Sequence, residues 1–379
     1  MRVTAGGAGA GRRRLRSVVR RAAPLLLAVA VGLAALPVAA SAAEPVSRRD
    51  RERAETAYKR ASAFFEDGKF IEALREFQNV ALLDPGRVEA YFAQGLCLLR
   101  LDELDQAVER FERTLALAPD HAPAHYNLAV ALEQRGDTTA ARRHLQRALA
   151  CDPRLPGAHF ALARLAEQGG DRAGAIAELR RELALRPDDG RVHAQLGYLY
   201  AAAGQDDSAR VHLDYALRRD PRLARAYLDR GRVEERAARW AAAESLYALG
   251  CAADSTDFDL CFARAGARFR LERYADAADD YARAAALDAS SAAAPFSRGV
   301  ALERAGDPNG ARDAYLEAVA RDSAYADAWL NLGLLYGRAG AREEAIRYLE
   351  RYLQLAPDSE RAAQVRAILT DLKKRPRPR

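Results

Sequence analysis

The sequence predicts an all-α protein, an α-solenoid in which one helix–turn–helix unit repeats along the chain. A pattern of 34 residues recurs without insertion or deletion from Ala54 to Ser359, which gives nine copies. Within each copy position 20 is Ala, position 8 is Gly or Ala, and position 24 is Phe, Leu or Tyr. A fixed period of this length is typical of stacked helical units, each of which buries its apolar face against its neighbours.

Residues 1–42 precede the repeats and have the composition of an export signal. Seven arginines and no acidic residue lie here, followed by the apolar run LLLAVAVGLAAL and by small residues ending in Ala40-Ser41-Ala42. This order predicts a signal peptide cleaved near Ala42, and hence an exported protein that is periplasmic or secreted. The alternative is a signal anchor, because the uncharged residues 22–43 are numerous enough to cross a bilayer. In both cases the rest of the chain faces outward.

Each repeat is expected to hold two helices, after a short linker over residues 43–53. Positions 4, 7, 8 and 11 recur at helical spacing and form the apolar face of a first helix, and positions 20, 24 and 27 form that of a second. Small residues at positions 8 and 20 allow the two helices to approach closely. In six repeats glycine at position 15 ends the first helix, and in six proline at position 32 stops the second.

At these positions the chain resembles the tetratricopeptide repeat (TPR) family, over residues 54–359. The resemblance implies a right-handed superhelix whose first helices line a concave groove. Residues 360–374 then look like a capping helix that shields the last apolar face, before a basic disordered tail at 375–379. The ninth repeat, with Tyr352 as its departure at position 27, carries the matching residues Trp329, Leu332, Gly333, Tyr336, Ala345, Leu349 and Pro357.

The net charge does not indicate a nucleic-acid partner. The chain has a net charge of +6, from 59 Lys and Arg against 53 Asp and Glu. Seven of the basic residues lie in the predicted signal peptide, so that 52 remain, and five of those lie in the final KKRPRPR. The repeats themselves are therefore mildly acidic, and no basic face for a nucleic acid is expected.

No motif predicts a catalytic centre, a cofactor or a metal site. The sequence lacks the patterns G-x-x-x-x-G-K-[ST], G-x-S-x-G and H-E-x-x-H. His125, His159 and His193 all occupy position 4, but neighbouring helices lie too far apart for these side chains to share a metal ion. We therefore expect a protein without enzymatic activity. Cys251 and Cys261, on facing helices of an exported protein, are candidates for a disulfide.

Candidate partner-binding residues lie next to the core stripe, at positions 5, 6 and 9 of the first helices. In the resembling family positions 5 and 9 face the concave surface. Tyr and Phe are suitable anchors for a bound segment, and amides at position 6 can hydrogen-bond a peptide backbone. The predicted groove set is Tyr58, Phe92, Tyr126, Asn127, Phe160, Arg164, Gln195, Tyr198, Arg232, Phe262, Phe296, Leu330 and Asn331.

Repeats six to eight depart from the pattern in a shared way. Arg230, Arg264 and Arg298 occupy position 7, and in repeats six and seven Glu234 and Arg268 occupy position 11. Charges at normally buried positions need partners. One interpretation is an internal bridge from Glu234 to Arg264 or Arg268, and the other is an acid-binding or flexible segment. In either case we expect repeats six and seven to be the least stable part of the array.

Together these features predict an exported, non-enzymatic scaffold that binds protein segments in its concave groove, within a bacterial cell envelope. Its partners are then peptide segments or other envelope proteins. One alternative is an assembly platform of an envelope machine, anchored in the membrane through residues 22–43. Another, from a different class, is a module that binds glycan or peptidoglycan through the groove aromatics. Membrane contact is expected only if the anchor is retained.

Overall fold

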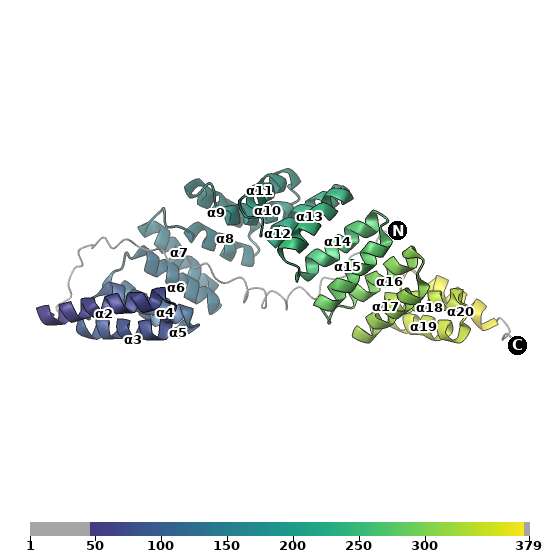
Figure 1. Cartoon of the computed structure of the whole chain (residues 1–379), viewed down its shortest axis with the longest axis horizontal. Helices are drawn as coiled ribbons and strands as arrows, with labels where there is room; N and C mark the ends of the chain where they lie inside the picture. The colour runs from purple at the N-terminus through teal and green to yellow at the C-terminus, as the bar shows by residue number, and fades with distance from the viewer. Residues whose placement is uncertain (1–45, 375–379) are drawn as a thin grey trace.

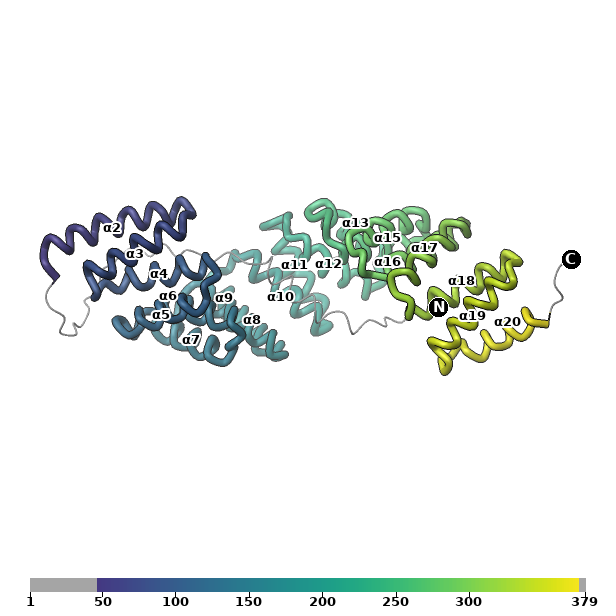
Figure 2. The backbone as a smooth tube through the Cα atoms, turned by 90° about the horizontal axis from the view of Figure 1, so that it is seen from below, coloured from purple at the N-terminus to yellow at the C-terminus, as the bar shows by residue number. Residues whose placement is uncertain are grey.

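The computed structural model describes residues 46–374, and in this part of the chain every regular element is an α-helix. The helices form hairpins that stack into an elongated arch, with α2 at one end and α20 at the other (Figures 1 and 2). The predicted all-α solenoid is confirmed. None of these helices has both the length and the apolar composition needed to cross a bilayer.

In chain order the helices are α2 (Arg48–Glu66), α3 (Phe70–Leu83), α4 (Val88–Arg100), α5 (Leu104–Leu117), α6 (Ala122–Gln134), α7 (Thr138–Cys151), α8 (Ala158–Gln168), α9 (Arg172–Leu185), α10 (Gly190–Ala202), α11 (Asp206–Arg219), α12 (Ala224–Arg236), α13 (Trp240–Ala253), α14 (Phe258–Arg270), α15 (Tyr274–Leu287), α16 (Ala293–Ala305), α17 (Pro308–Arg321), α18 (Ala326–Arg338), α19 (Arg342–Leu355) and α20 (Ala362–Lys374).

The first helix of each hairpin lies on the inner side of the arch. Consecutive helices pack against each other throughout the described chain. Helices two apart also meet where α4 contacts α6, α10 contacts α12, and α12 contacts α14. All of these are first helices, and stacked units approach most closely on the concave side of a curved array. The even-numbered helices from α2 to α18 therefore present the concave face.

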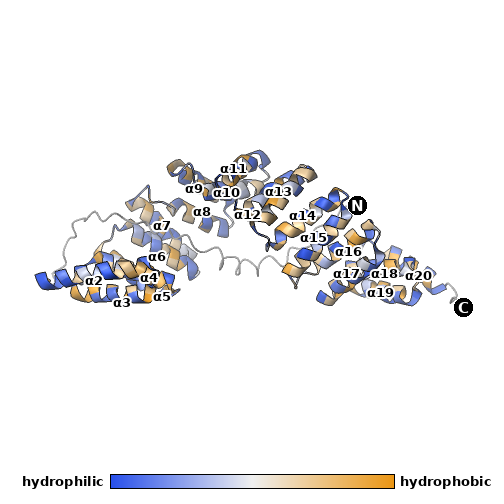
Figure 3. Cartoon of the chain, in the orientation of Figure 1, coloured by the Kyte–Doolittle hydropathy of each residue, from blue (hydrophilic) through white to orange (hydrophobic). Residues whose placement is uncertain are grey.

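Close contact between position 8 and position 24 holds each hairpin together. Position 20 is fully buried in every repeat, as at Ala73 and Ala243. A Cβ atom added to Gly95 would lie 2.5 Å from the Phe111 ring, so only glycine fits against this ring without rearrangement. Apolar and polar residues are both present on every helix (Figure 3), as expected when one face packs inward.

The turn between the two helices uses a left-handed residue at position 15 in every repeat. Six repeats place a glycine there, with positive φ as predicted, for example 76° at Gly68. The other three use Asp102, Ala238 and Glu272, with φ of 62°, 54° and 60°. A left-handed conformation costs an L-residue roughly 1–2 kcal/mol. Two of these three strained turns lie in repeats six and seven.

Two predicted boundaries change in the structure. Residues 48–53, assigned to the linker, belong to α2, because Ser47 caps this helix by accepting a hydrogen bond from the Asp50 backbone N–H. The capping helix α20 begins at Ala362 rather than at residue 360. The predicted signal or anchor segment and the basic tail at 375–379 lie outside the described residues.

The charged residues of repeats six and seven are paired inside the protein, but with partners other than those predicted. Glu234 pairs with Arg230 and Arg239, and not with an arginine of repeat seven. Arg264 makes two hydrogen bonds to Asp280, of 2.7 and 2.5 Å. The prediction of an internal bridge was therefore right in kind and wrong in its partners. The lower stability of these repeats stays a prediction.

Arg268 joins repeat seven to repeat six. Its guanidinium donates at 2.9 Å to Asp280 and at 3.0 Å to Glu244 of α13. The Asp280 side chain is 6% exposed and those of Arg264 and Arg268 are 14% and 19% exposed. Two carboxylates, Asp280 and Glu244, therefore balance the two largely buried guanidinium groups.

Candidate functional site

The aromatic residues at position 5 are half-buried between helices. Tyr58 packs edge-on against Phe77 at 5.4 Å and lies under the Arg87 guanidinium at 4.2 Å. Phe296 contacts Tyr315 and Tyr325, with ring centroids 5.8 and 5.1 Å apart. These rings are part of the packing between helices as well as of the inner surface. The other half-buried aromatics of the predicted set are Phe92, Tyr126, Phe160 and Phe262.

Three predicted groove residues at position 9 are exposed on the inner face. Tyr198 on α10 is 39% exposed, and Arg164 and Arg232 lie on α8 and α12 on either side of it. Burial raises the pKa of Tyr198, and the negative charges of Glu167 and Asp229 raise it further. Tyr198 is thus an accessible aromatic ring with carboxylates on the helices to either side.

The amides predicted at position 6 are occupied by contacts within the protein. Gln195 donates at 2.6 Å to Glu167, and Asn331 donates at 3.2 Å to the Tyr315 hydroxyl. Asn127 is 8% exposed and donates to the Pro123 carbonyl of its own helix. Asn127 is therefore not free to bind a peptide backbone, which corrects the prediction for this residue.

Leu330 does not lie on an open surface, which is a second correction. Its side chain is 2% exposed and packs with Leu349 and with Val365 and Leu369 of α20. The capping helix takes the place that the first helix of a further repeat would occupy. The predicted groove therefore ends before α18.

A row of glutamates at position 12 of the first helices was not among the predicted site residues. Glu133 binds Arg164 and Gln168 of the next first helix, and Glu167 binds Gln195. Glu303 binds Arg338 in the same way. The row was visible in the sequence at the 34-residue period, as Glu133, Glu167, Glu235 and Glu303. These contacts join neighbouring repeats across the inner face.

Asp229, at position 6 of α12, is a perturbed carboxylate on the same face. Burial raises its pKa to about 6, although Arg232 and then Arg225 act in the opposite direction. The nearest atoms of the Asp229 and Arg232 pair are 3.8 Å apart. Perturbed carboxylates are common at binding sites, although structural ion pairs perturb pKa values as well.

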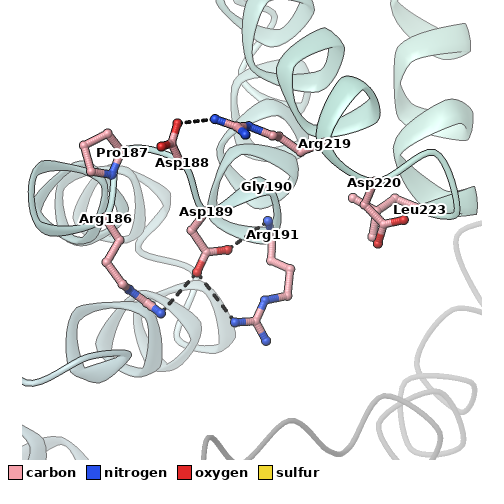
Figure 4. Close-up of a pocket in the computed structure, with 9 residues that line it drawn as sticks. All are labelled: Arg186, Pro187, Asp188, Asp189, Gly190, Arg191, Arg219, Asp220 and Leu223. Atoms are coloured by element: carbon pink, nitrogen blue, oxygen red, sulfur yellow. Dashed lines mark hydrogen bonds and ion pairs between the residues drawn. The ribbon is translucent and has the colours of Figure 1, made fainter.

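A cavity of about 600 Å³ lies at the edge of the array, between the turn that precedes α10 and the end of α11. Figure 4 shows Asp188 turned toward Arg219 and Asp189 turned toward Arg186 and Arg191, whereas Asp220 lies apart from these pairs. Asp189 lies 3.3 Å from Arg186, and Arg219 donates to Asp188 at 2.5 Å. Apart from Asp220, which accepts from the Arg222 backbone N–H, the charged residues that line this cavity pair with each other, so we interpret it as a junction between repeats.

The histidines at position 4 each pair with a residue of the second helix in the same hairpin. His125 and His144 approach within 3.0 Å through their Nδ1 atoms, and His193 and His212 within 2.9 Å. His125 also bonds the Pro119 carbonyl through Nε2, so its Nδ1 accepts from His144. Within residues 46–374, no three His, Cys, Asp or Glu side chains converge to hold a metal ion.

These histidine pairs predict a loss of stability in mild acid. Burial lowers the pKa of His125, His144 and His212, and Arg147 or the paired ring lowers each further. The neutral form is favoured in the folded state, so this stability is present above the unfolded pKa of about 6.5 and is lost as the pH falls. We expect the Tm to fall between about pH 7 and pH 5, more steeply than in a His144→Gln, His212→Gln variant. An equal fall of the Tm with pH in the parent protein and the variant would contradict this role of the histidine pairs.

Cys251 and Cys261 are free thiols in the structure, and both are buried. The two thiols act on each other, which lowers the pKa of Cys251 to about 7 and raises that of Cys261. The disulfide stays a prediction. Peptide mapping of the purified protein without reduction is expected to show linked Cys251 and Cys261 peptides. Four thiols open to alkylation would exclude the bond.

Comparison with protein families agrees with the repeat. One tetratricopeptide repeat family model matches residues 58–109, 92–156, 262–326 and 296–360, which together exceed half of the chain, and a second matches 132–194. The chain belongs to the tetratricopeptide repeat family. The matched ranges leave out residues 195–261, which include the TPR repeat where Arg230 and Glu234 occupy apolar positions. A comparison with curated proteins found no match.

Solved structures of TPR proteins resemble parts of this chain. A tetratricopeptide repeat protein from Parabacteroides merdae is 15% identical over 66% of this chain and 99% of that one, with a TM-score of 0.49. PilF from Pseudomonas aeruginosa is 19% identical over 65% and 97%, with a TM-score of 0.48. YrrB, described as a TPR protein with an unusual peptide-binding site, is 18% identical over 48% and 95%, with a TM-score of 0.43. At these identities the likeness concerns the fold alone.

Proposed function

We propose that this protein is an exported, non-enzymatic TPR scaffold that binds an extended segment of a partner protein along its concave face. Tyr198 is the observation that carries the proposal. It is a large aromatic side chain, 39% exposed, on the inner helices. Half-buried aromatic rings continue this surface on both sides. Aromatic anchors in a partly enclosed surface are typical of protein-binding sites.

The segment is expected to lie across α8, α10 and α12. These helices present Arg164, Tyr198 and Arg232 at the same position of successive repeats. Charged and aromatic groups alternate there, which suits a peptide whose side chains point alternately toward the surface. The open surface ends before α18, where α20 covers Leu330.

A photocrosslinking amino acid at position 198 tests this proposal. We expect it to capture a protein segment in the cell envelope, whereas the same residue at Val211, which is 67% exposed on α11, captures nothing specific. Tyr198→Ala should weaken binding of the captured segment at least tenfold, with Val211→Ala as the matched control. Equal crosslinking at 198 and 211 would contradict a concave site. A sugar adduct at 198 would favour the glycan-binding alternative.

Export is part of the proposal and is supported by residues 1–42. We expect the mature chain to begin near Ala43, and mass spectrometry of the intact protein from the envelope measures this. A chain that retains its first residues in the membrane fraction would instead favour the anchored platform.

A further inference from the structure

One glutamate of the position-12 row receives no bridge from the next repeat. Glu235 lies at the end of α12, in register with Glu133, Glu167 and Glu303. The next first helix, α14, places Ala263 at position 6 and Gly266 at position 9, and neither side chain can donate a hydrogen bond. The carboxylate that is bridged elsewhere in the row is therefore left open here.

Repeat eight shows how the protein completes the same arrangement. The Tyr315 hydroxyl donates to Glu303 at 2.5 Å and accepts from the Asn331 amide at 3.2 Å. The Arg338 guanidinium also binds Glu303. Asn331 and Arg338 both come from the next first helix, α18. Two nitrogen groups from that helix thus satisfy the tyrosine and the carboxylate together.

In repeat six the tyrosine and the carboxylate are present, but α14 supplies no amide and turns its arginine toward another partner. Tyr247, the counterpart of Tyr315, is fully buried, and its hydroxyl lies beside Glu235 but completes no hydrogen bond of good geometry. Ala263 stands at the position of Asn331. Arg270 stands at the position of Arg338, but its guanidinium lies over the Trp240 ring, 5.4 Å from the centroid.

Other cations near this site are engaged elsewhere. Arg232 lies 3.8 Å from Asp229, and Arg236 donates at 3.1 Å to Asp206. Burial raises the pKa of Glu235, although the Tyr247 hydroxyl and then the charges of Arg232, Arg270 and Arg236 act in the opposite direction. There is also room for an incoming group, because a Cβ atom on Gly266 would meet nothing nearer than the Tyr281 hydroxyl at 3.8 Å.

We propose that Glu235 and Tyr247 form a subsite for an arginine side chain of the bound segment. A guanidinium supplies several N–H groups in one plane, so that it can donate both to a carboxylate and to a neighbouring hydroxyl. It would thus replace the two groups that α18 provides in repeat eight. This inference rests on the proposed function, because it assumes a protein segment on the concave face.

A pair of synthetic peptides tests the subsite. Each is an acetylated, amidated alanine peptide with either one arginine or one citrulline, which keeps the size and removes the charge. Calorimetric titration of the purified protein is expected to show at least about tenfold weaker binding of the citrulline peptide. Ala263→Asn should fill the site from within, as Asn331 does, and abolish this preference. Ser297→Asn, at the same position of the next repeat, is the matched control and should retain it.

The outcomes separate this inference from the proposed function. Equal affinities for the two peptides, or a preference that survives Ala263→Asn, would overturn the arginine subsite. Crosslinking at position 198 is unaffected by either result, since it reports on the concave face as a whole. A Tyr247→Phe variant gives a second readout, because it removes the hydroxyl and keeps the ring. Its preference for arginine is expected to fall while the thermal midpoint stays near that of the parent protein.

Discussion

Replacing Asp280 with Ala is expected to lower the free energy of unfolding by about 3–5 kcal/mol. Asp280 is the shared partner of Arg264 and Arg268, and all three side chains are largely buried. The substitution leaves two guanidinium groups at the interface between α14 and α15, with Glu244 as the remaining partner of Arg268. A buried charge without its partner is far more costly than the pair itself. Denaturant unfolding measures the change.

Asp279→Ala is the matched control, because Asp279 is exposed beside Asp280, and it should change stability by less than about 0.5 kcal/mol. The double variant Arg264→Leu, Asp280→Ala introduces leucine, which occupies position 7 in several other repeats. It should recover much of the lost stability. A change below about 1 kcal/mol for Asp280→Ala alone would mean that both arginines reach water. The interface would then depend on its apolar contacts.

The second large effect is expected at the capping helix. Leu369→Ala removes a side chain that is 6% exposed and packs with Leu330, Leu349 and Tyr352, and it should cost about 2–5 kcal/mol locally. Each repeat contacts only its neighbours, so the loss should stay near the C-terminal end. Hydrogen exchange is expected to rise in α18–α20 and to stay unchanged in α2–α5.

Thr370→Ala is the control for this position, because Thr370 is exposed on the same turn of α20. Exchange that rises evenly along the whole array would contradict the local character of the packing. Size-exclusion chromatography adds a second measurement. Weakening α20 uncovers Leu330 and its neighbours, and we expect the Leu369→Ala protein to self-associate more than the parent protein.

The helices were predictable because the same requirement recurs at a fixed spacing. Glycine at position 15 meets the need for a left-handed turn, and alanine at position 20 fits a fully buried helix contact. Because most repeats share these residues, the constraint can be recognised from the sequence. Ala238 and Glu272 were not predictable as turn residues, since nothing local favours a left-handed conformation for them. There the constraint comes from the rest of the hairpin.

The candidate site was less predictable, because its residues depend on what the next helix presents. Leu330 follows the groove pattern and is nevertheless covered, since its neighbour is α20 and not another repeat. Asn127 has a suitable side chain, but its amide donates to the Pro123 carbonyl of its own helix. Glu235 occupies the same repeat position as Glu133, and it differs only in that α14 presents no donor at positions 6 and 9 and directs Arg270 over Trp240.

The arch also has a mechanical consequence. Within residues 46–374 the main contacts join neighbouring hairpins, so a small rotation at one junction adds to the rotation at the next. A small rotation at each junction, summed along the stack, changes the distance between the two ends of the arch by a large amount. We therefore expect the span of the arch to be adjustable. The ion pair between Glu244 of α13 and Arg268 of α14 lies at a junction near its middle.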